Sequence, residues 1–111
     1  MQERKLMELP WTASSPRLAR TALQHWGANL EAEVVVSELV MNAVRHGAPP
    51  VSLVAERTAE TFRVGVCDDR HDMGAPGPDS VGLQLVEAFA TTWGVTPIRG
   101  DGKCVWAEFP A

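Results

Sequence analysis

The hydrophobic period of this chain changes near residue 50, and that change limits the folds it can adopt. Between Asn29 and Gly47, apolar residues recur at helical spacing, which predicts an amphipathic helix capped by Asn29 and ended by Gly47 and the prolines that follow. From residue 51 apolar and polar residues alternate, so 51–55 and 62–66 are predicted strands of one hairpin. The apolar side of the predicted helix consists of Leu30, Val34, Val35, Leu39, Ala43 and Val44. Such a helix and hairpin can bury each other's apolar faces, which favours a helix layer on a sheet.

The remaining predicted elements extend this arrangement to both ends of the chain. They are an edge strand at Lys5–Leu9 ended by Pro10, a helix from an N-cap at Ser15 through Pro16 to Gly27, a helical pattern through Leu83, Val86, Ala90 and Trp93, and a closing hairpin of Val95–Ile98 and Lys103–Phe109. The chain 1–111 is therefore predicted to be a single domain of the α+β class. We expect a two-layer sandwich, with a mostly antiparallel, mixed sheet and the helices on one face.

Composition narrows the class of function. A chain of 111 residues with 45% hydrophobic and 22% charged residues can bury one core. Its formal net charge of -4 and its interspersed acids and bases provide no basic field for a nucleic acid backbone, so direct nucleic acid binding is not expected. Apolar runs are only a few residues long, and a membrane-spanning segment is not expected either.

Two cysteines, Cys67 and Cys104, are too few for a disulfide framework, and the amino terminus does not resemble a secretion signal. The prediction is a protein of the reducing cytoplasm. Cys67 falls in a predicted strand, where we expect a small buried apolar side chain without chemistry of its own.

Polar side chains that could carry chemistry gather on the helix that follows Asn29. Glu38, Asn42 and His46 are spaced by four residues and share one side of that helix. A carboxylate, an amide oxygen and an imidazole placed in this way can orient a nucleophile, bind a hard cation and contact phosphates. The polar side of any surface helix shows the same spacing, so the spacing alone favours an ordinary solvated face.

The residues around this helix resemble a known family. E-L-V-M-N-A-V-R-H-G at 38–47 resembles the N box of the GHKL ATPases, in their anti-sigma-factor serine kinase branch. V-G-V-C-D at 64–68 is similar to the G1 box, and V-G-L-Q-L-V at 81–86 is similar to the G2 box. T-W-G-V at 92–95 and G-K-C-V-W at 102–106 look like the closing hairpin of that branch, so the resemblance extends over almost the whole chain.

The resemblance implies a Bergerat-type fold that binds ATP and Mg²⁺. It makes Asn42 the Mg²⁺ ligand, Glu38 the general base, and His46 a further contact with the nucleotide. Asp68 becomes the adenine-binding residue, because its carboxylate can accept a hydrogen bond from the exocyclic amine of the base. The neighbouring Asp69 is expected to be solvated.

The resemblance also implies an ATP lid at 69–80 and nucleotide contacts from Gly82 and Leu83, where Gly82 presents backbone amides to phosphate. This chain departs from the family pattern in its lid, which is short and lacks an arginine beside Gly82, and at two further places. Ser80-Val81 stands where a first glycine is common, and Cys104 stands where threonine is common near the adenine pocket. Both departures weaken the expected nucleotide site.

Two classes of function follow. One is a protein-serine kinase that binds a sigma factor and phosphorylates a STAS-type anti-sigma antagonist; the other is a catalytically degenerate module of the same fold that acts only by docking to a protein. A homodimer is compatible with either. A metal cluster in the acidic run 68–72 is the weaker interpretation, because adjacent residues do not converge on one ion by themselves.

Overall fold

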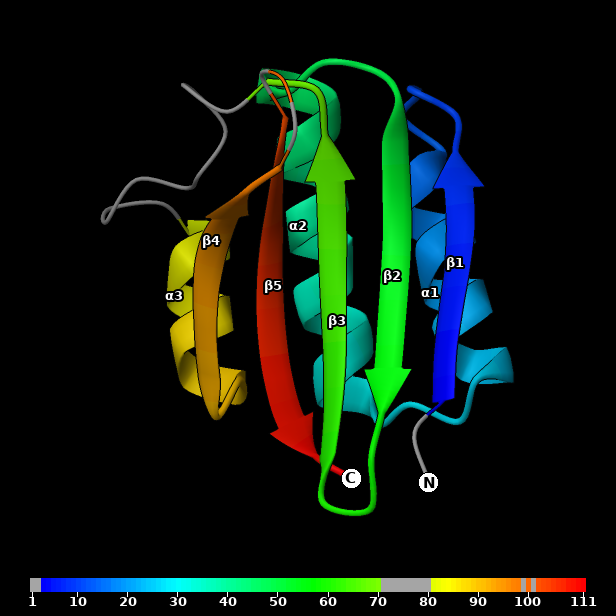
Figure 1. The fold of residues 1–111 in the computed structure, drawn as a ribbon, viewed down its shortest axis with the longest axis vertical. Coiled ribbons are helices and arrows are strands. Elements are labelled where there is room, and N and C mark those ends of the chain that lie inside the picture. Colours follow the sequence, from blue (N-terminus) through cyan, green and yellow to red (C-terminus); the bar gives the residue numbers. More distant parts are fainter. Residues whose placement is uncertain (1–2, 71–80, 99, 101) are drawn as a thin grey trace.

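A computed structural model describes residues 3–70, 81–98, 100 and 102–111, and the side chains of 81–83 are outside that description. The elements, in chain order, are β1 (Glu3–Leu9), α1 (Ser15–His25), α2 (Leu30–His46), β2 (Val51–Arg57), β3 (Thr61–Asp68), α3 (Val81–Phe89), β4 (Thr92–Pro97) and β5 (Lys103–Pro110) (Figure 1). The strands form one sheet in the order β1-β2-β3-β5-β4.

All four neighbouring pairs of strands in this sheet are antiparallel. The expected mixed sheet is therefore wrong in that detail, whereas the α+β two-layer architecture is confirmed. The reason is that the neighbouring strands β3 and β5 are joined through α3 and β4, so that β5 runs in the opposite direction to β3. The β1 strand lies at one edge, as the following proline predicted, but it is longer than expected and begins at Glu3.

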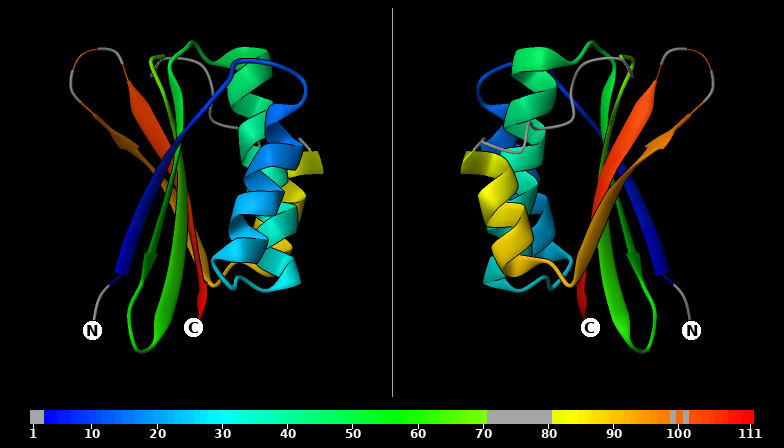
Figure 2. Two further views of the ribbon diagram at one scale, coloured as in Figure 1. Left: turned by 90° about the vertical axis from the view of Figure 1, so that its right-hand side faces the viewer. Right: turned by 90° about the vertical axis from the view of Figure 1, so that its left-hand side faces the viewer.

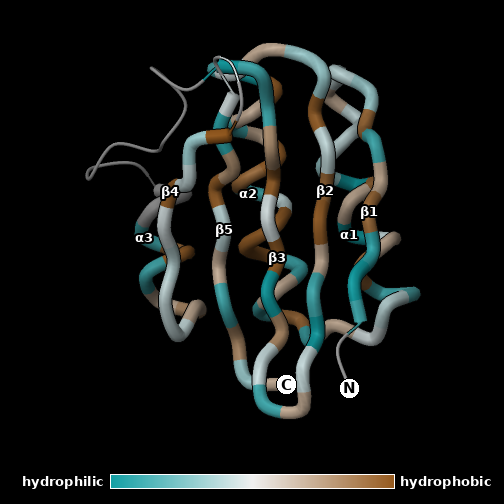
Figure 3. The backbone as a smooth tube through the Cα atoms, viewed as in Figure 1, coloured by the Kyte–Doolittle hydropathy of each residue, from teal (hydrophilic) through white to brown (hydrophobic). Residues whose placement is uncertain are grey.

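The helices lie side by side on one face of the sheet, and no described helix covers the other face (Figure 2). In the view down on the sheet, hydrophobic stretches of β2 and β3 lie in front of hydrophobic stretches of α2 (Figure 3). The core between the two layers is formed by Leu23, Val35, Val36, Leu39, Val40, Val51, Leu53, Val64, Val66, Val105, Ala107 and Phe109, among others. None of the described helices has the length and apolar character needed to cross a membrane.

The α2 helix begins as predicted, because the side chain of Asn29 accepts a hydrogen bond from the backbone N–H of Ala32 at 2.9 Å. Its predicted apolar side needs correction. Leu30 is 69% exposed, whereas Ala32, Val36 and Val40 complete the buried side. The buried stripe is turned toward these residues because α2 packs on the sheet and on α1 at once.

Two further boundaries differ from the prediction. The α3 helix ends at Phe89, and Trp93 lies in β4 instead of continuing the helical pattern. The N-cap of α1 is Ser14, and the Ser15 hydroxyl instead donates to the carbonyl of Pro10. In each case a tertiary contact overrides a local pattern, since Trp93 packs against the core from its strand.

Trp106 organises the open face of the sheet. A Cβ added at Gly94 would lie 2.6 Å from the Trp106 ring, so glycine lets the indole cover the adjacent strand. The indole N–H donates to the Thr96 hydroxyl at 3.0 Å, and the Arg63 guanidinium lies 4.1 Å from the centre of the ring. Arg63 also pairs with Glu108 at 2.7 Å, so this face has its own cluster of polar and aromatic contacts.

Candidate functional site

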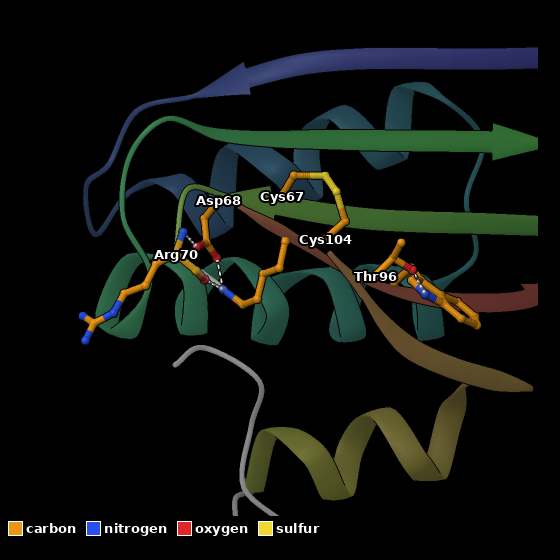
Figure 4. Close-up of a disulfide and its surroundings, with 7 residues drawn as sticks. Cys67, Asp68, Arg70, Thr96 and Cys104 are labelled. Atoms are coloured by element: carbon orange, nitrogen blue, oxygen red, sulfur yellow. Dashed lines mark hydrogen bonds and ion pairs between the residues drawn. A yellow bond between two sulfur atoms is a disulfide. The ribbon is translucent and has the colours of Figure 1, made fainter. Parts of the chain in front are cut away.

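The candidate site is built where β3 ends, α2 ends and β5 begins. Asp68, the last residue of β3, is only 3% exposed. Its Oδ2 accepts a hydrogen bond from the Lys103 ammonium at 2.5 Å, and its Oδ1 accepts one from the backbone N–H of Arg70 at 2.9 Å. Lys103 Nζ donates in addition to the carbonyl of Arg70 at 2.7 Å. The carboxylate is thus held by an ion pair and a backbone amide (Figure 4).

Two glycines allow the backbone to approach this carboxylate. A Cβ at Gly47 would lie 2.6 Å from Cγ of Asp68 and 2.7 Å from the carbonyl oxygen of Ala43. A Cβ at Gly102 would lie 3.0 Å from the carbonyl oxygen of Asp68. The end of α2 and the start of β5 are therefore close to Asp68 only because both positions lack a side chain.

The helical residues of the predicted site lie on the flank of α2 away from α1. The α1 side is marked by Ser37, whose hydroxyl accepts a hydrogen bond from Arg20 at 2.7 Å. Asn42 lies about 140° around the helix axis from Ser37, on the flank that faces α3. Glu38 is half-buried one turn before it, and His46 is exposed one turn after it.

Asn42 has the one unsatisfied side-chain polar atom found buried in the described part of the chain. Its Nδ2 is shielded from solvent and has no hydrogen-bond partner there. The nitrogen and oxygen of an amide exchange by a half-turn of the terminal dihedral, so either atom can face a ligand. A buried polar atom without a partner costs about 1–3 kcal/mol, and that cost fits a residue shaped for an oxygen-ligated cation or a nucleotide.

Lys103 is the residue of the site that sequence reasoning missed. It alternates with Val105, Ala107 and Phe109, which all face the helices, so period-2 counting along β5 places its side chain in the buried layer. A buried lysine needs a charged partner, and the register pairs Lys103 with Asp68 across the two strands. The alternation of buried and exposed positions along β5 could therefore have revealed the buried Lys103 from the sequence alone.

Part of the predicted site cannot be placed. Gly82 and Leu83 are in the first turn of α3, but their side chains are outside the described set. Of the predicted lid, only Asp69 and Arg70 are described, and Asp69 is exposed with its N–H bonded to the carbonyl of Ala48 at 2.9 Å. Residues 71–80, including Ser80, lie outside the described residues, as does most of the acidic run 68–72.

The two cysteines correct the prediction most clearly. Cys67 and Cys104 form a disulfide between β3 and β5, and they are cross-strand neighbours in the register (Figure 4). Cys67 is therefore not an unpaired apolar thiol. Cys104 does not line the site either, because it points to the open face while the adjacent Lys103 points to the helices. Spacing along the chain could not reveal a pair that forms only when β5 aligns with β3.

Comparison with known proteins agrees with this architecture. No protein-family model and no curated protein matches the chain. A crystal structure of the RsbU and RsbW domains of Rv1364c from Mycobacterium tuberculosis superposes with a TM-score of 0.72 at 22% identity, over 96% of this chain. The chain has the fold of an RsbW domain. It corresponds to 31% of the matched chain, so that the RsbW likeness concerns one part of a longer protein. The GHKL-type fold expected from the sequence boxes is thereby confirmed.

Proposed function

We propose that this chain binds ATP with Mg²⁺ and acts as an anti-sigma-type protein-serine kinase. The observation that carries the proposal is the placement of Asn42. Its amide nitrogen is buried and unsatisfied on the flank of α2 toward α3, near the helix end that contacts Asp68. The RsbW-type fold is the second support, because Asn42 and Asp68 stand in the boxes that resemble nucleotide-binding positions.

Each proposed role is the one that the resemblance implies, and the position of the side chain supports it. Asp68, held at the strand end by Lys103, would accept a hydrogen bond from the exocyclic amine of adenine. Asn42 would ligate Mg²⁺, which neutralises charge on the transferred phosphoryl group when bound. Glu38, half-buried one turn before Asn42, would orient the attacking serine hydroxyl and take up its proton.

The nucleotide contacts proposed for His46, Gly82 and Leu83 complete this site. His46 is exposed at the end of α2, from which an imidazole can extend to a phosphate. Gly82 and Leu83 begin α3, and the free N–H groups of a helix start favour anions. We propose the cytoplasm as the compartment, a sigma factor and a STAS-type antagonist as partners, and no direct contact with nucleic acid.

A non-catalytic docking module is the second candidate, and a specific observation favours it. Both carboxylate oxygens of Asp68 already accept hydrogen bonds within the chain. A carboxylate can accept about four, which leaves lone pairs for a base, but the protein is also satisfied without one. If no nucleotide binds, the same residues serve as architecture.

Transfer of the γ-phosphoryl group separates the two candidates. Wild-type protein, radiolabelled ATP and Mg²⁺ would be mixed with a STAS-type antagonist from the same genome, beside the variants Glu38→Gln and Glu31→Gln. Glu31 is an exposed residue in the first turn of the same helix, so its variant controls for loss of a carboxylate. We expect label transfer by wild type and Glu31→Gln and a loss of about 100-fold or more in Glu38→Gln. Undiminished transfer by Glu38→Gln would remove Glu38 as the base.

A further inference from the structure

The side chain of Lys103 contains a hydrogen-bond donor that no described residue of the fold uses. It is 1% exposed, and its ammonium has three N–H groups. Two are directed to Oδ2 of Asp68 and to the carbonyl of Arg70, at 2.5 and 2.7 Å. In the described part of the chain, no third acceptor bonds to this nitrogen. A buried cation with an unused donor is a group prepared for a ligand.

The unused donor lies beside unused acceptor capacity. Asp68 receives one hydrogen bond on each oxygen, although a carboxylate can accept about four. An acceptor and a donor therefore lie side by side, within a pair that is neutral as a whole. The pair is almost completely shielded from water, so a hydrogen bond made there does not compete with solvent.

The complementary ligand edge presents a donor beside an acceptor. The six-membered ring of adenine has this edge, with an exocyclic amine at C6 next to the unprotonated nitrogen N1. We propose that Lys103 is a specificity-determining residue that donates to N1 of adenine while Asp68 accepts from the amine. The inference rests on the proposed ATP binding and adds a second base contact to it, through a residue of the closing hairpin to which the resemblance gave no role.

The proposal predicts a dependence on one ring atom. In 1-deaza-ATP, a C–H group replaces N1, while the exocyclic amine and the triphosphate are retained. Calorimetric titration of the wild-type protein should show binding weaker than that of ATP by roughly 10- to 100-fold, the range for a hydrogen bond to a charged group. Inosine triphosphate, which has an oxygen at C6 and an N–H at N1, should also bind more weakly than ATP. Equal affinity for ATP and 1-deaza-ATP would overturn the role of Lys103.

The variant Lys103→Met tests whether the preference for ATP over 1-deaza-ATP depends on the lysine. Lys103→Met keeps an unbranched apolar stem and removes the donors, so ATP and 1-deaza-ATP should then bind with equal affinity. Lys5→Met, on the exposed edge strand β1, should retain the wild-type preference. A preference for ATP that persists in folded Lys103→Met would contradict the proposal. If this variant does not fold, the affinities of the wild-type protein for ATP and 1-deaza-ATP still test whether N1 of adenine is contacted.

The outcomes of these titrations distinguish the proposed Lys103 contact from the proposed ATP binding on which it rests. Absence of saturable ATP binding to the folded wild-type protein would overturn both. Saturable ATP binding without any effect of N1 would leave the proposed function in place and overturn only the contact from Lys103.

Discussion

Two neighbouring links, a disulfide and an ion pair, join the end of β3 to the start of β5. Cys67–Cys104 is a covalent link on the open face of the sheet, and Asp68–Lys103 is an ionic link one residue further along each strand, on the face covered by helices. The register makes them consecutive cross-strand pairs, so alternation alone sends them to opposite faces. The strand ends near the candidate site are thereby fixed from both sides.

The difference between the links teaches which of them can respond to a ligand. The disulfide lies on a face that no described helix covers, and it responds to the redox state of its surroundings. The ion pair is buried, and it has hydrogen-bonding capacity left for a neutral base. We therefore expect a thiol reductant to act on the covalent link and a bound ligand to act on the ionic link, while both links stabilise the fold.

The largest effect is expected when the ionic link is broken from one side. Lys103→Met would leave the Asp68 carboxylate buried without its cation, which costs about 3–5 kcal/mol of the free energy of unfolding. Denaturant titration measures this loss. The control is Glu108→Gln, which breaks the more exposed Arg63–Glu108 pair on the open face, leaves the contact of Arg63 with Trp106 in place, and should cost below about 1 kcal/mol. Similar losses for both variants would mean that burial does not distinguish the two faces.

Breaking the covalent link should cost slightly less. Cys67 and Cys104 are 37 residues apart, and the loop-entropy relation gives about 4 kcal/mol as the upper value for such a link. Adding a thiol reductant during denaturant titration should lower the unfolding midpoint of wild type. The variant with both cysteines replaced by serine should not respond to the reductant. An unchanged wild-type midpoint, with reduction verified by thiol titration, would contradict a stabilising role.

A methyl group added beside the ionic link should cost about 1–3 kcal/mol. In Gly47→Ala the new Cβ would lie 2.6 Å from Cγ of Asp68 and 2.7 Å from the carbonyl of Ala43, so backbone or carboxylate must shift. Gly65→Ala is the matched control in β3, because its Cβ would meet no described atom closer than 3.8 Å. Thermal unfolding of both variants tests the comparison. A Gly47→Ala protein as stable as Gly65→Ala would show that the approach of α2 to Asp68 is loose.

The smallest effect on stability is expected at Asn42. Asn42→Leu removes a buried amide nitrogen that has no partner among the described residues, so stability should stay within about 1 kcal/mol of wild type or rise. Asn29→Ala is the contrasting variant, because it removes the N-cap bond to Ala32 and should cost about 1 kcal/mol. Denaturant titration compares the two. A loss larger than 2 kcal/mol in Asn42→Leu would indicate a structural role in place of ligand binding.

The sequence predicts local structure well because the decisive signals are local. The cap at Asn29, the end of α2 at Gly47 and the alternation after residue 50 each involve neighbours in the chain, and each is confirmed. Asp68 at the end of β3 was expected from the resemblance of 64–68 to the G1 box, and the strand does end there. The α+β class could be predicted from the order of these elements.

The features that could not be predicted depend on the register between strands that are distant in the sequence. The pairing of Cys67 with Cys104 and of Asp68 with Lys103 is set by how β5 aligns with β3, which no local pattern specifies. The buried side of α2 was misjudged at Leu30 for a similar reason, since packing against α1 and the sheet together decides it. The ionic link that defines the site was therefore the hardest feature to predict.

The most direct test of nucleotide binding is a calorimetric titration with ATP, with and without Mg²⁺, on wild type, Asp68→Asn and Asn42→Ala. We predict saturable binding to wild type, weaker binding to Asp68→Asn, and loss of the Mg²⁺ dependence in Asn42→Ala. Absence of heat and of saturation up to millimolar ATP, in protein shown to be folded, would contradict the account and leave a docking module with the same fold.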